Sequence, residues 1–257
     1  MIYLDNAATS FPKPESVYQA LDHFGRTSLA NPGRAGHKMA LAAKRVLDDG
    51  RHSLNQLFNG AGPERWAITF NCTDALNMAF KGLLCAGDHV ITTNLEHNSV
   101  SRPLQAMHHA GQIELTRIPC DGGGTIDAES LRQAITAKTK LIALTHASNV
   151  LGTVQPIAEI GLLARQNDLY LLVDAAQTAG VLPIDVKAMH IDMLAFPGHK
   201  SLYGPTGTGA LYVGPRVKLR AWREGGTGGD SASETQPVEL PYHLEGGTPN
   251  VLGMAGL

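Results

Sequence analysis

The spacing of apolar and polar positions changes character near residue 67. Before it, apolar residues recur at helical spacing over residues 15–25 and 37–58, and the turn-rich residues 31–36 separate the two stretches. After it, short apolar runs predict strands, and the longer amphipathic stretches between them predict helices. The predicted strands are residues 67–70, 89–92, 113–118, 141–145, 170–173 and 210–213, and the predicted helices are residues 75–84, 100–110, 128–137 and 157–167.

Alternating strands and helices are typical of an α/β domain in which helices cover both faces of a mostly parallel sheet. Residues 224–236 form a loop rich in Gly, Ser and Thr, and Thr248-Pro249-Asn250 predicts the start of one more helix. We expect this helix, and with it the chain, to be cut short at Leu257, because we predict no terminating cap before it. Its apolar residues then lack a predicted partner surface: Val251, Leu252, Met254 and Leu257.

Composition narrows the function classes. The 257 residues are 43% hydrophobic and 17% charged, which suits one large or two modest globular domains. A net charge of -2, with scattered Lys and Arg, gives no basic patch for nucleic acid or for a membrane surface. No apolar run approaches the roughly 18 residues of a membrane span, and the first five residues lack the pattern of a signal peptide. We therefore predict a cytoplasmic protein with a small-molecule partner.

The cysteines predict neither a disulfide framework nor a metal site. Cys72, Cys85 and Cys120 form no CxxC pair and are odd in number. Each lies in or beside an apolar segment, where a cysteine ordinarily serves as a small buried hydrophobe.

The segment around Lys200 carries the most informative chemistry. Lys200 follows Gly198-His199, and a glycine-rich turn comes next. An amine held between a His and such a turn suits imine formation with an aldehyde cofactor, because the flanking backbone can approach closely. The alternative is a surface turn with a solvated Lys, which the segment by itself does not exclude.

Polar residues follow several predicted strands, at the sheet edge where α/β proteins gather ligands. Asp174 ends one strand and can hold a proton on a heteroaromatic ring nitrogen, or cap a helix instead. Residues 71–74 precede a helix, so backbone N–H groups and the Thr73 hydroxyl can bind a phosphate, or serve as plain caps. His97 can stack on a ring, and Asn149 can donate to a phenolic or carboxylate oxygen; the alternatives are a surface His and a turn Asn. Together with Gln177, these positions favour one cofactor site.

Six motifs occur in order along the chain: residues 3–9 (YLDNAAT), 73–74 (TD), 96–98 (EHN), 173–177 (VDAAQ), 198–200 (GHK) and 247–250 (GTPN). With these motifs the chain resembles the class V, fold type I pyridoxal phosphate (PLP) enzymes, specifically the cysteine desulfurase and selenocysteine lyase-like branch. The resemblance implies a large PLP-binding domain over residues 31–257 with a seven-stranded, mostly parallel sheet, preceded by an N-terminal segment, residues 1–30. It also implies a homodimer, and a small C-terminal domain that is largely absent from this sequence.

The same resemblance implies a role for each site residue. Lys200 forms the imine with PLP and then serves as the proton-carrying acid and base. The other implied roles are ring-nitrogen pairing by Asp174, ring stacking by His97, contact with the phenolic oxygen by Gln177, phosphate binding by Thr73 beside Cys72 and Asp74 and by His199, proximity to the substrate carboxylate for Asn149, and contact with the neighbouring subunit's phosphate for Thr248.

The implied reaction converts L-cysteine, or L-selenocysteine in the related lyases, to alanine. In the desulfurase case a protein thiolate takes the sulfur as a persulfide and passes it to a sulfur-acceptor protein. Two departures stand against this pattern: Pro197 occupies the position of a phosphate-binding Ser, and the family's substrate-binding Arg and mobile Cys would lie beyond Leu257. The alternatives are an aminotransferase or lyase of the same family and a catalytically inactive fragment or interaction module.

Overall fold

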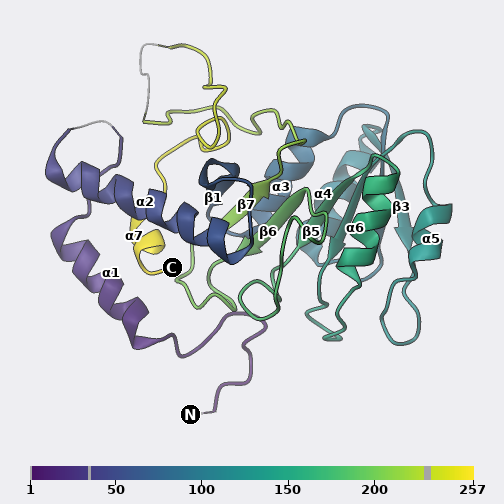
Figure 1. Cartoon of the computed structure of the whole chain (residues 1–257), viewed down its shortest axis with the longest axis horizontal. Helices are drawn as coiled ribbons and strands as arrows, with labels where there is room; N and C mark the ends of the chain where they lie inside the picture. Colours follow the sequence, from purple (N-terminus) through teal and green to yellow (C-terminus); the bar gives the residue numbers. More distant parts are fainter. Residues whose placement is uncertain (1, 34–35, 229–232) are drawn as a thin grey trace.

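A single seven-stranded sheet forms the centre of the fold (Figure 1). The structure is a computed structural model that describes residues 2–33, 36–228 and 233–257, so parts of the predicted segments 31–36 and 224–236 lie outside it. The strand order is β1-β7-β6-β5-β4-β2-β3. The strands are β1 (Trp66–Thr69), β2 (Asp88–Thr93), β3 (Ile113–Ile118), β4 (Thr139–Thr145), β5 (Tyr170–Asp174), β6 (Met193–Pro197) and β7 (Gly209–Val213).

The sheet is mostly parallel, as predicted. β7 runs antiparallel to its neighbours β1 and β6, and the other neighbouring pairs are parallel. β6 has no counterpart among the six strands predicted from apolar runs, although all five of its residues are buried. It ends in Pro197, a residue that cannot donate to a ladder and is normally confined to strand ends and edges.

The helices lie close to their predicted positions. They are α1 (Glu15–Thr27), α2 (Lys38–Leu57), α3 (Cys72–Leu83), α4 (Asn98–His109), α5 (Ala128–Gln133), α6 (Ile157–Gln166) and α7 (Val251–Ala255), with a short 3-10 helix, η1 (Pro63–Arg65), before β1. α5 ends earlier than predicted. α3 begins at Cys72 rather than at residue 75, so residues 72–74 form its first turn instead of preceding it. Among the described residues, no helix is long and apolar enough to cross a membrane.

Two helical layers cover opposite faces of the sheet. Successive strand residues point to opposite faces, so Val90 and Leu172 pack on the layer of α3 and α4, whereas Ile91 and Val173 pack on the layer of α5 and α6. Figure 1 shows α3 and α6 on opposite sides of the strands. This double covering leaves the strand ends as the place where polar side chains can gather.

The last helix has a partner surface, which corrects the sequence-based expectation. Val251 and Met254 of α7 are buried against Phe24 of α1 and Leu47 of α2. The side chain of Asn250 caps the start of α7 by accepting from the Gly253 N–H at 2.9 Å, and Gly256 occupies its C-cap. The periodicity of five residues was too short to identify that partner.

A buried ion pair joins α2, β1 and the segment before α7. Arg51 Nη2 donates to both oxygens of Glu245, at 2.9 and 2.7 Å, and Arg51 Nε donates to the Trp66 carbonyl at 3.2 Å. The Ile68 N–H donates to Glu245 Oε1 at 2.7 Å. Burial raises the pKa of Glu245 although Arg51 opposes the shift. The Glu245 carboxylate therefore depends on Arg51 for its charge.

We expect Arg51→Met to lower the free energy of unfolding by about 3–5 kcal/mol, because it leaves a buried carboxylate without its partner. Arg51→Met/Glu245→Gln should recover part of this loss, since the amide oxygen still accepts from Ile68 without a charge. The matched control, Arg26→Met, breaks the exposed Arg26–Asp22 pair and should cost less than about 1 kcal/mol. Equal losses for Arg51→Met and Arg26→Met in urea titrations would contradict the assignment.

Candidate active site

A cavity of about 180 Å³ lies at the carboxyl ends of the parallel strands. It brings together most of the predicted site residues, which follow β1, β2, β4, β5 and β6 in the sequence. The predicted residues that line it are Cys72, Thr73, His97, Asn149, Asp174, Gln177, His199 and Lys200, and the others are Asn71, Ser99, Thr145, Ala147, Ala176 and Pro197.

Asp174 is buried at the end of β5 and is oriented by two donors. Its Oδ1 accepts from the Ala176 N–H at 2.9 Å and from the Cys72 thiol at 3.4 Å. Both of these side-chain hydrogen bonds fall on Oδ1, which leaves Oδ2 for a donor in the cavity. No helix follows β5 in the described chain before β6, so Asp174 is not the helix cap that the sequence left open. Burial raises the pKa of Asp174 above its usual value, and the two hydrogen bonds to Oδ1 and the nearby charge of Lys200 offset only part of this rise.

Cys72 supports Asp174 and is not poised as a nucleophile. Its thiol is buried and donates to the Asp174 carboxylate. Burial, and then the nearby Asp174 charge, raise the pKa of Cys72 well above the usual range. A thiol that stays protonated is a poor nucleophile, so Cys72 acts here as a hydrogen-bond donor.

Lys200 projects from the loop after β6, beside the strand ends. The loop is closed by backbone bonds from the Gly198 N–H to the Thr208 carbonyl at 2.8 Å and from the Gly204 N–H to the Gly198 carbonyl at 2.9 Å. Position 198 requires glycine, because a Cβ there would collide with Thr208 Oγ1. Burial and the charge of Lys200 lower the pKa of His199, which favours its neutral imidazole.

The start of α3 offers backbone donors to the cavity. Asn71 caps the helix, and its side chain accepts from the Asp74 N–H at 2.8 Å. The two preceding N–H groups, of Cys72 and Thr73, make no backbone or side-chain hydrogen bond within the described structure. Free N–H groups at a helix start attract anions. Asp74 itself does not line the cavity.

Thr73, Ser99 and His97 form a short hydrogen-bonded chain. The Thr73 and Ser99 hydroxyls lie 2.8 Å apart, and Ser99 Oγ lies 2.9 Å from His97 Nδ1. His97 Nδ1 also accepts from the Ser99 N–H at 3.1 Å as the N-cap of α4. Because Nδ1 accepts, a neutral His97 carries its proton on Nε2. His97 is therefore fixed by its helix rather than free in a surface loop.

Gln177 and Asn149 face the cavity from neighbouring strand ends, and Thr248 lies elsewhere. Gln177 Nε2 donates to the Ala7 carbonyl at 3.0 Å. Asn149 is exposed on the loop after β4. Thr248 lines a separate, larger cavity, so the structure does not bring it to the other predicted residues.

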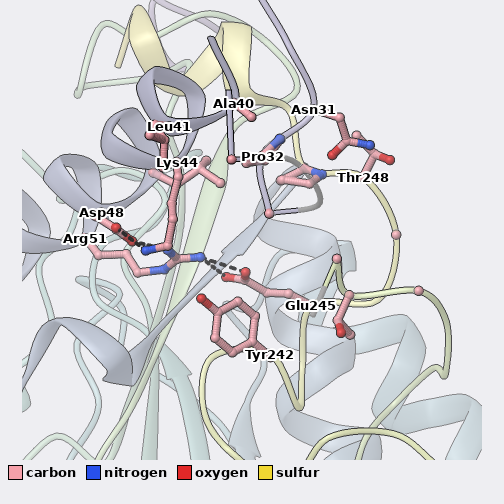
Figure 2. A pocket seen from close by; sticks show the side chains of 18 residues that line it. Asn31, Pro32, Ala40, Leu41, Lys44, Asp48, Arg51, Tyr242, Glu245 and Thr248 are labelled. Carbon is pink, nitrogen blue, oxygen red and sulfur yellow. Dashed lines mark hydrogen bonds and ion pairs between the residues drawn. The ribbon is translucent and has the colours of Figure 1, made fainter. Parts of the chain in front are cut away.

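That larger cavity, of about 770 Å³, lies between α2 and the segment before α7 (Figure 2). Its charged side chains are already paired: Lys44 contacts Asp48 at 2.5 Å, and Arg51 contacts Glu245. Size favours this cavity as a binding site, whereas the chemistry favours the smaller one, which holds an amine, a carboxylate and free backbone donors. We assign the candidate site to the smaller cavity.

The sequence did not identify Ser99, which lines the cavity, or Glu96, whose carboxyl group is buried near Asp174 without lining the cavity. Ser99 could have been found from its position in the first turn of the helix that follows His97. Glu96 lies just before His97, and its Oε1 accepts from the Thr93 hydroxyl at 2.6 Å. Burial raises the pKa of Glu96 to about 8, and the neighbouring Asp174 charge adds to the rise. No sequence pattern predicts this protonated carboxyl group, because its raised pKa depends on burial in the folded chain.

The donor set fits PLP. Lys200 provides an amine for the aldehyde, Asp174 Oδ2 can accept from the ring nitrogen, and the α3 start can receive the phosphate. No group of three or more His, Cys, Asp or Glu side chains among the described residues is arranged to hold a metal ion.

We expect Glu96→Gln to change how stability depends on pH. The native carboxyl keeps its proton up to pH about 8, whereas the unfolded chain releases it near the usual value of 4.5. Between these values the native state binds more protons, so the stability of the parent protein relative to Glu96→Gln should fall by about 1.4 kcal/mol per pH unit.

Urea titrations at several pH values would measure this difference. The matched control is Glu129→Gln, which changes an exposed carboxylate on α5. A difference between the parent and Glu96→Gln that stays constant from pH 5 to pH 8 would show that Glu96 ionises normally.

Comparison with known proteins agrees with this geometry. The sequence profile described as Aminotransferase class-V matches residues 2–257. A probable cysteine desulfurase of Halalkalibacterium halodurans is 35% identical, with 100% of this chain and 65% of that protein aligned. One from Methanothermobacter thermautotrophicus is 36% identical over 100% of this chain and 64% of that protein. The chain thus spans less than two thirds of the length of these relatives.

Solved structures give the same result. The apo structure of a cysteine desulfurase from Thermococcus onnurineus matches with a TM-score of 0.92 and 33% identity, covering 99% of this chain and 65% of that one. A structure of SspA in complex with cysteine matches with a TM-score of 0.88 and 32% identity, covering 100% of this chain and 71% of that one. The fold is thus the large-domain fold of the fold type I, PLP-dependent enzymes, and the chain belongs to the class-V aminotransferase family.

Proposed function

We propose that this chain binds PLP and forms the cofactor-binding part of an enzyme that removes sulfur from L-cysteine. The observation that carries the proposal is the shared cavity of Lys200 and Asp174, with Oδ1 of the carboxylate already held by Cys72 and Ala176. The relatives named cysteine desulfurases and the SspA complex with cysteine support L-cysteine as the substrate.

Each residue has a defined task in this proposal. Bound PLP supplies an electron sink for negative charge at the α-carbon of an amino acid. Asp174 Oδ2 holds the proton on the ring nitrogen, and Lys200 Nζ takes the proton from the substrate α-carbon and returns it. His97 would cover the ring, Gln177 would contact the phenolic oxygen, and Asn149 would lie near the substrate carboxylate, since all three line the cavity.

The phosphate contacts come from several elements. The Cys72 and Thr73 N–H groups at the start of α3 provide backbone donors, and His199 adds an imidazole. The Asp74 N–H is already bonded to Asn71, so Asp74 contributes through its place in the first turn. Pro197 offers no hydroxyl, and we assign that contact to the Thr73 hydroxyl, which can donate to the phosphate while it accepts from Ser99 Oγ at 2.8 Å.

The remaining expectations stay predictions. A homodimer would let Thr248, which lies outside the cavity of its own chain, reach the phosphate of the neighbouring subunit. A sulfur-acceptor protein and selenocysteine as a second substrate follow from the resemblance alone, whereas the predicted cytoplasmic location follows from the pattern of the sequence. The division into residues 1–30 and residues 31–257 also follows from the resemblance. The sulfur-accepting thiolate must come from a cysteine other than Cys72, given its raised pKa.

We expect the purified chain to acquire visible absorbance when PLP is added, because the cofactor attaches to Lys200 Nζ with loss of water. Lys200→Ala should abolish this absorbance, and the matched control Lys218→Ala, which removes an exposed lysine, should leave it unchanged. Borohydride reduction followed by peptide mass analysis would locate the modified lysine. Absence of absorbance in the parent chain, or a label on another lysine, would refute the site assignment.

With PLP bound, L-cysteine in deuterated water should exchange its α-proton at a rate that depends on Lys200. We expect Lys200→Ala to lose this exchange and Asp174→Asn to slow it by about 10²–10⁴-fold. Product analysis separates the alternatives: alanine with sulfide or persulfide indicates a desulfurase, and amino transfer to a 2-oxo acid indicates an aminotransferase. A chain that binds PLP without α-proton exchange would be an inactive cofactor-binding protein.

A further inference from the structure

One backbone oxygen next to Lys200 receives an unusual number of hydrogen bonds. The carbonyl oxygen of His199 accepts from four donors of one short segment: Thr9 Oγ1 at 3.0 Å, the Ser10 N–H at 3.2 Å, Ser10 Oγ at 3.1 Å and Lys13 Nζ at 3.0 Å. A carbonyl oxygen has two lone pairs, so this exceeds what is needed to satisfy a turn. Thr9 Oγ1 also lies 3.0 Å from His199 Nδ1.

The position of this oxygen restrains the backbone of Lys200. The His199 carbonyl and the Lys200 N–H belong to one planar peptide unit, so fixing the oxygen also fixes the direction toward the Lys200 Cα. On the other side, the Lys200 carbonyl accepts from the Tyr203 N–H at 2.9 Å. The backbone of Lys200 is therefore held from both sides, and the N-terminal segment supplies one of the two holds.

Lys13 is committed to this arrangement. Its ammonium group also donates to the Ser10 carbonyl at 3.0 Å and to Ser10 Oγ at 2.8 Å, which accounts for all three of its protons. Within the described residues, Lys13 forms no ion pair with a carboxylate. Burial lowers its pKa. The Lys13 ammonium group therefore bonds only to neutral oxygens, and its charge orients them.

The same segment is tied to the next strand end. Gln177 Nε2, after β5, donates to the Ala7 carbonyl at 3.0 Å. The Tyr3 hydroxyl fastens the segment to itself through the Thr9 carbonyl at 3.0 Å and the Asp5 carbonyl at 3.1 Å. Residues 2–13 contain no helix or strand, so the bonds to His199 and Gln177 place the segment along the cavity edge, whereas those of Tyr3 stay within the segment.

We propose that Thr9, Ser10 and Lys13 are positioning residues, which clamp the His199 carbonyl and so aim the Lys200 amine into the cavity. The proposal rests on the function assigned to Lys200 above. The clamp explains why a segment without regular structure lies against the active-site lysine rather than elsewhere on the domain.

The test uses the full chain in four forms: parent, Lys13→Met, Lys13→Arg and Tyr3→Phe. Lys13→Met removes the charged donor, and Lys13→Arg keeps one. Tyr3→Phe loosens the same segment without touching His199, and so controls for general fastening. The first readout is hydrogen exchange of the Tyr203 and Gly204 amides in the cofactor-free protein, and the second is the rate at which PLP attaches to Lys200.

We expect Lys13→Met to exchange these amides about tenfold faster, the effect of losing a charge-assisted hydrogen bond, and to slow PLP attachment about tenfold through the misplaced amine. Lys13→Arg should restore both values, and Tyr3→Phe should resemble the parent. If Lys13→Met does not fold, as judged by circular dichroism, Lys13→Gln takes its place.

Unchanged exchange and attachment in the Lys13 variant would overturn the clamp. Equal effects of Tyr3→Phe and Lys13→Met would overturn it as well, since general fastening would then suffice. Failure of the parent chain to take up PLP would refute the proposed function, while the exchange measurement would still decide whether the clamp exists.

Discussion

The parallel register of β4, β5 and β6 is the constraint on which the site depends. Thr145 pairs with Asp174, and Asp174 pairs with Ala195, so the three strands reach the same row of the sheet. Whatever follows each strand must therefore emerge at one edge, between the two helical layers. This places a carboxylate, an amide and an amine around one cavity although they lie far apart in the sequence. A shift of one residue in any of these strands would turn its side chains to the opposite face.

The antiparallel strand β7 completes this arrangement by returning the chain beside β6. Because β6 and β7 are paired from Met193–Val213 to Pro197–Gly209, the loop that carries Lys200 starts and ends on adjacent strands. Gly209 permits the close approach, since a Cβ there would meet the Phe196 carbonyl oxygen at 2.9 Å. The lysine thus stands on a loop that is closed at its base, and the hydrogen bonds from Thr9, Ser10 and Lys13 restrain it from outside.

Much of this could be predicted from the sequence, and the failures have physical reasons. Six strands were recognisable as apolar runs, and the polar residues after them pointed to one edge, where Lys200 and Asp174 line the same cavity. β6 was missed because its run ends in Pro197, a residue that normally argues against a central strand. Glu96 was missed because its raised pKa comes from burial, whereas Ser99 was missed although its place in the first turn of the helix after His97 could have indicated it. The partner of α7 could not be predicted, because the pattern of a five-residue helix does not indicate which surface it packs against.

The ion pair between Arg51 and Glu245 has a consequence for how the chain folds during synthesis. Its partners are separated by 194 positions, and the bonds from the N-terminal segment to His199 span up to 190. α1 and α2 leave the ribosome long before the charges and apolar surfaces that hold them. Contacts between residues so far apart in the sequence form slowly. Until they form, α1 and α2 expose apolar surface that can associate with other chains. The topology of this domain therefore delays the packing of α1 and α2 until their distant partners have been synthesised.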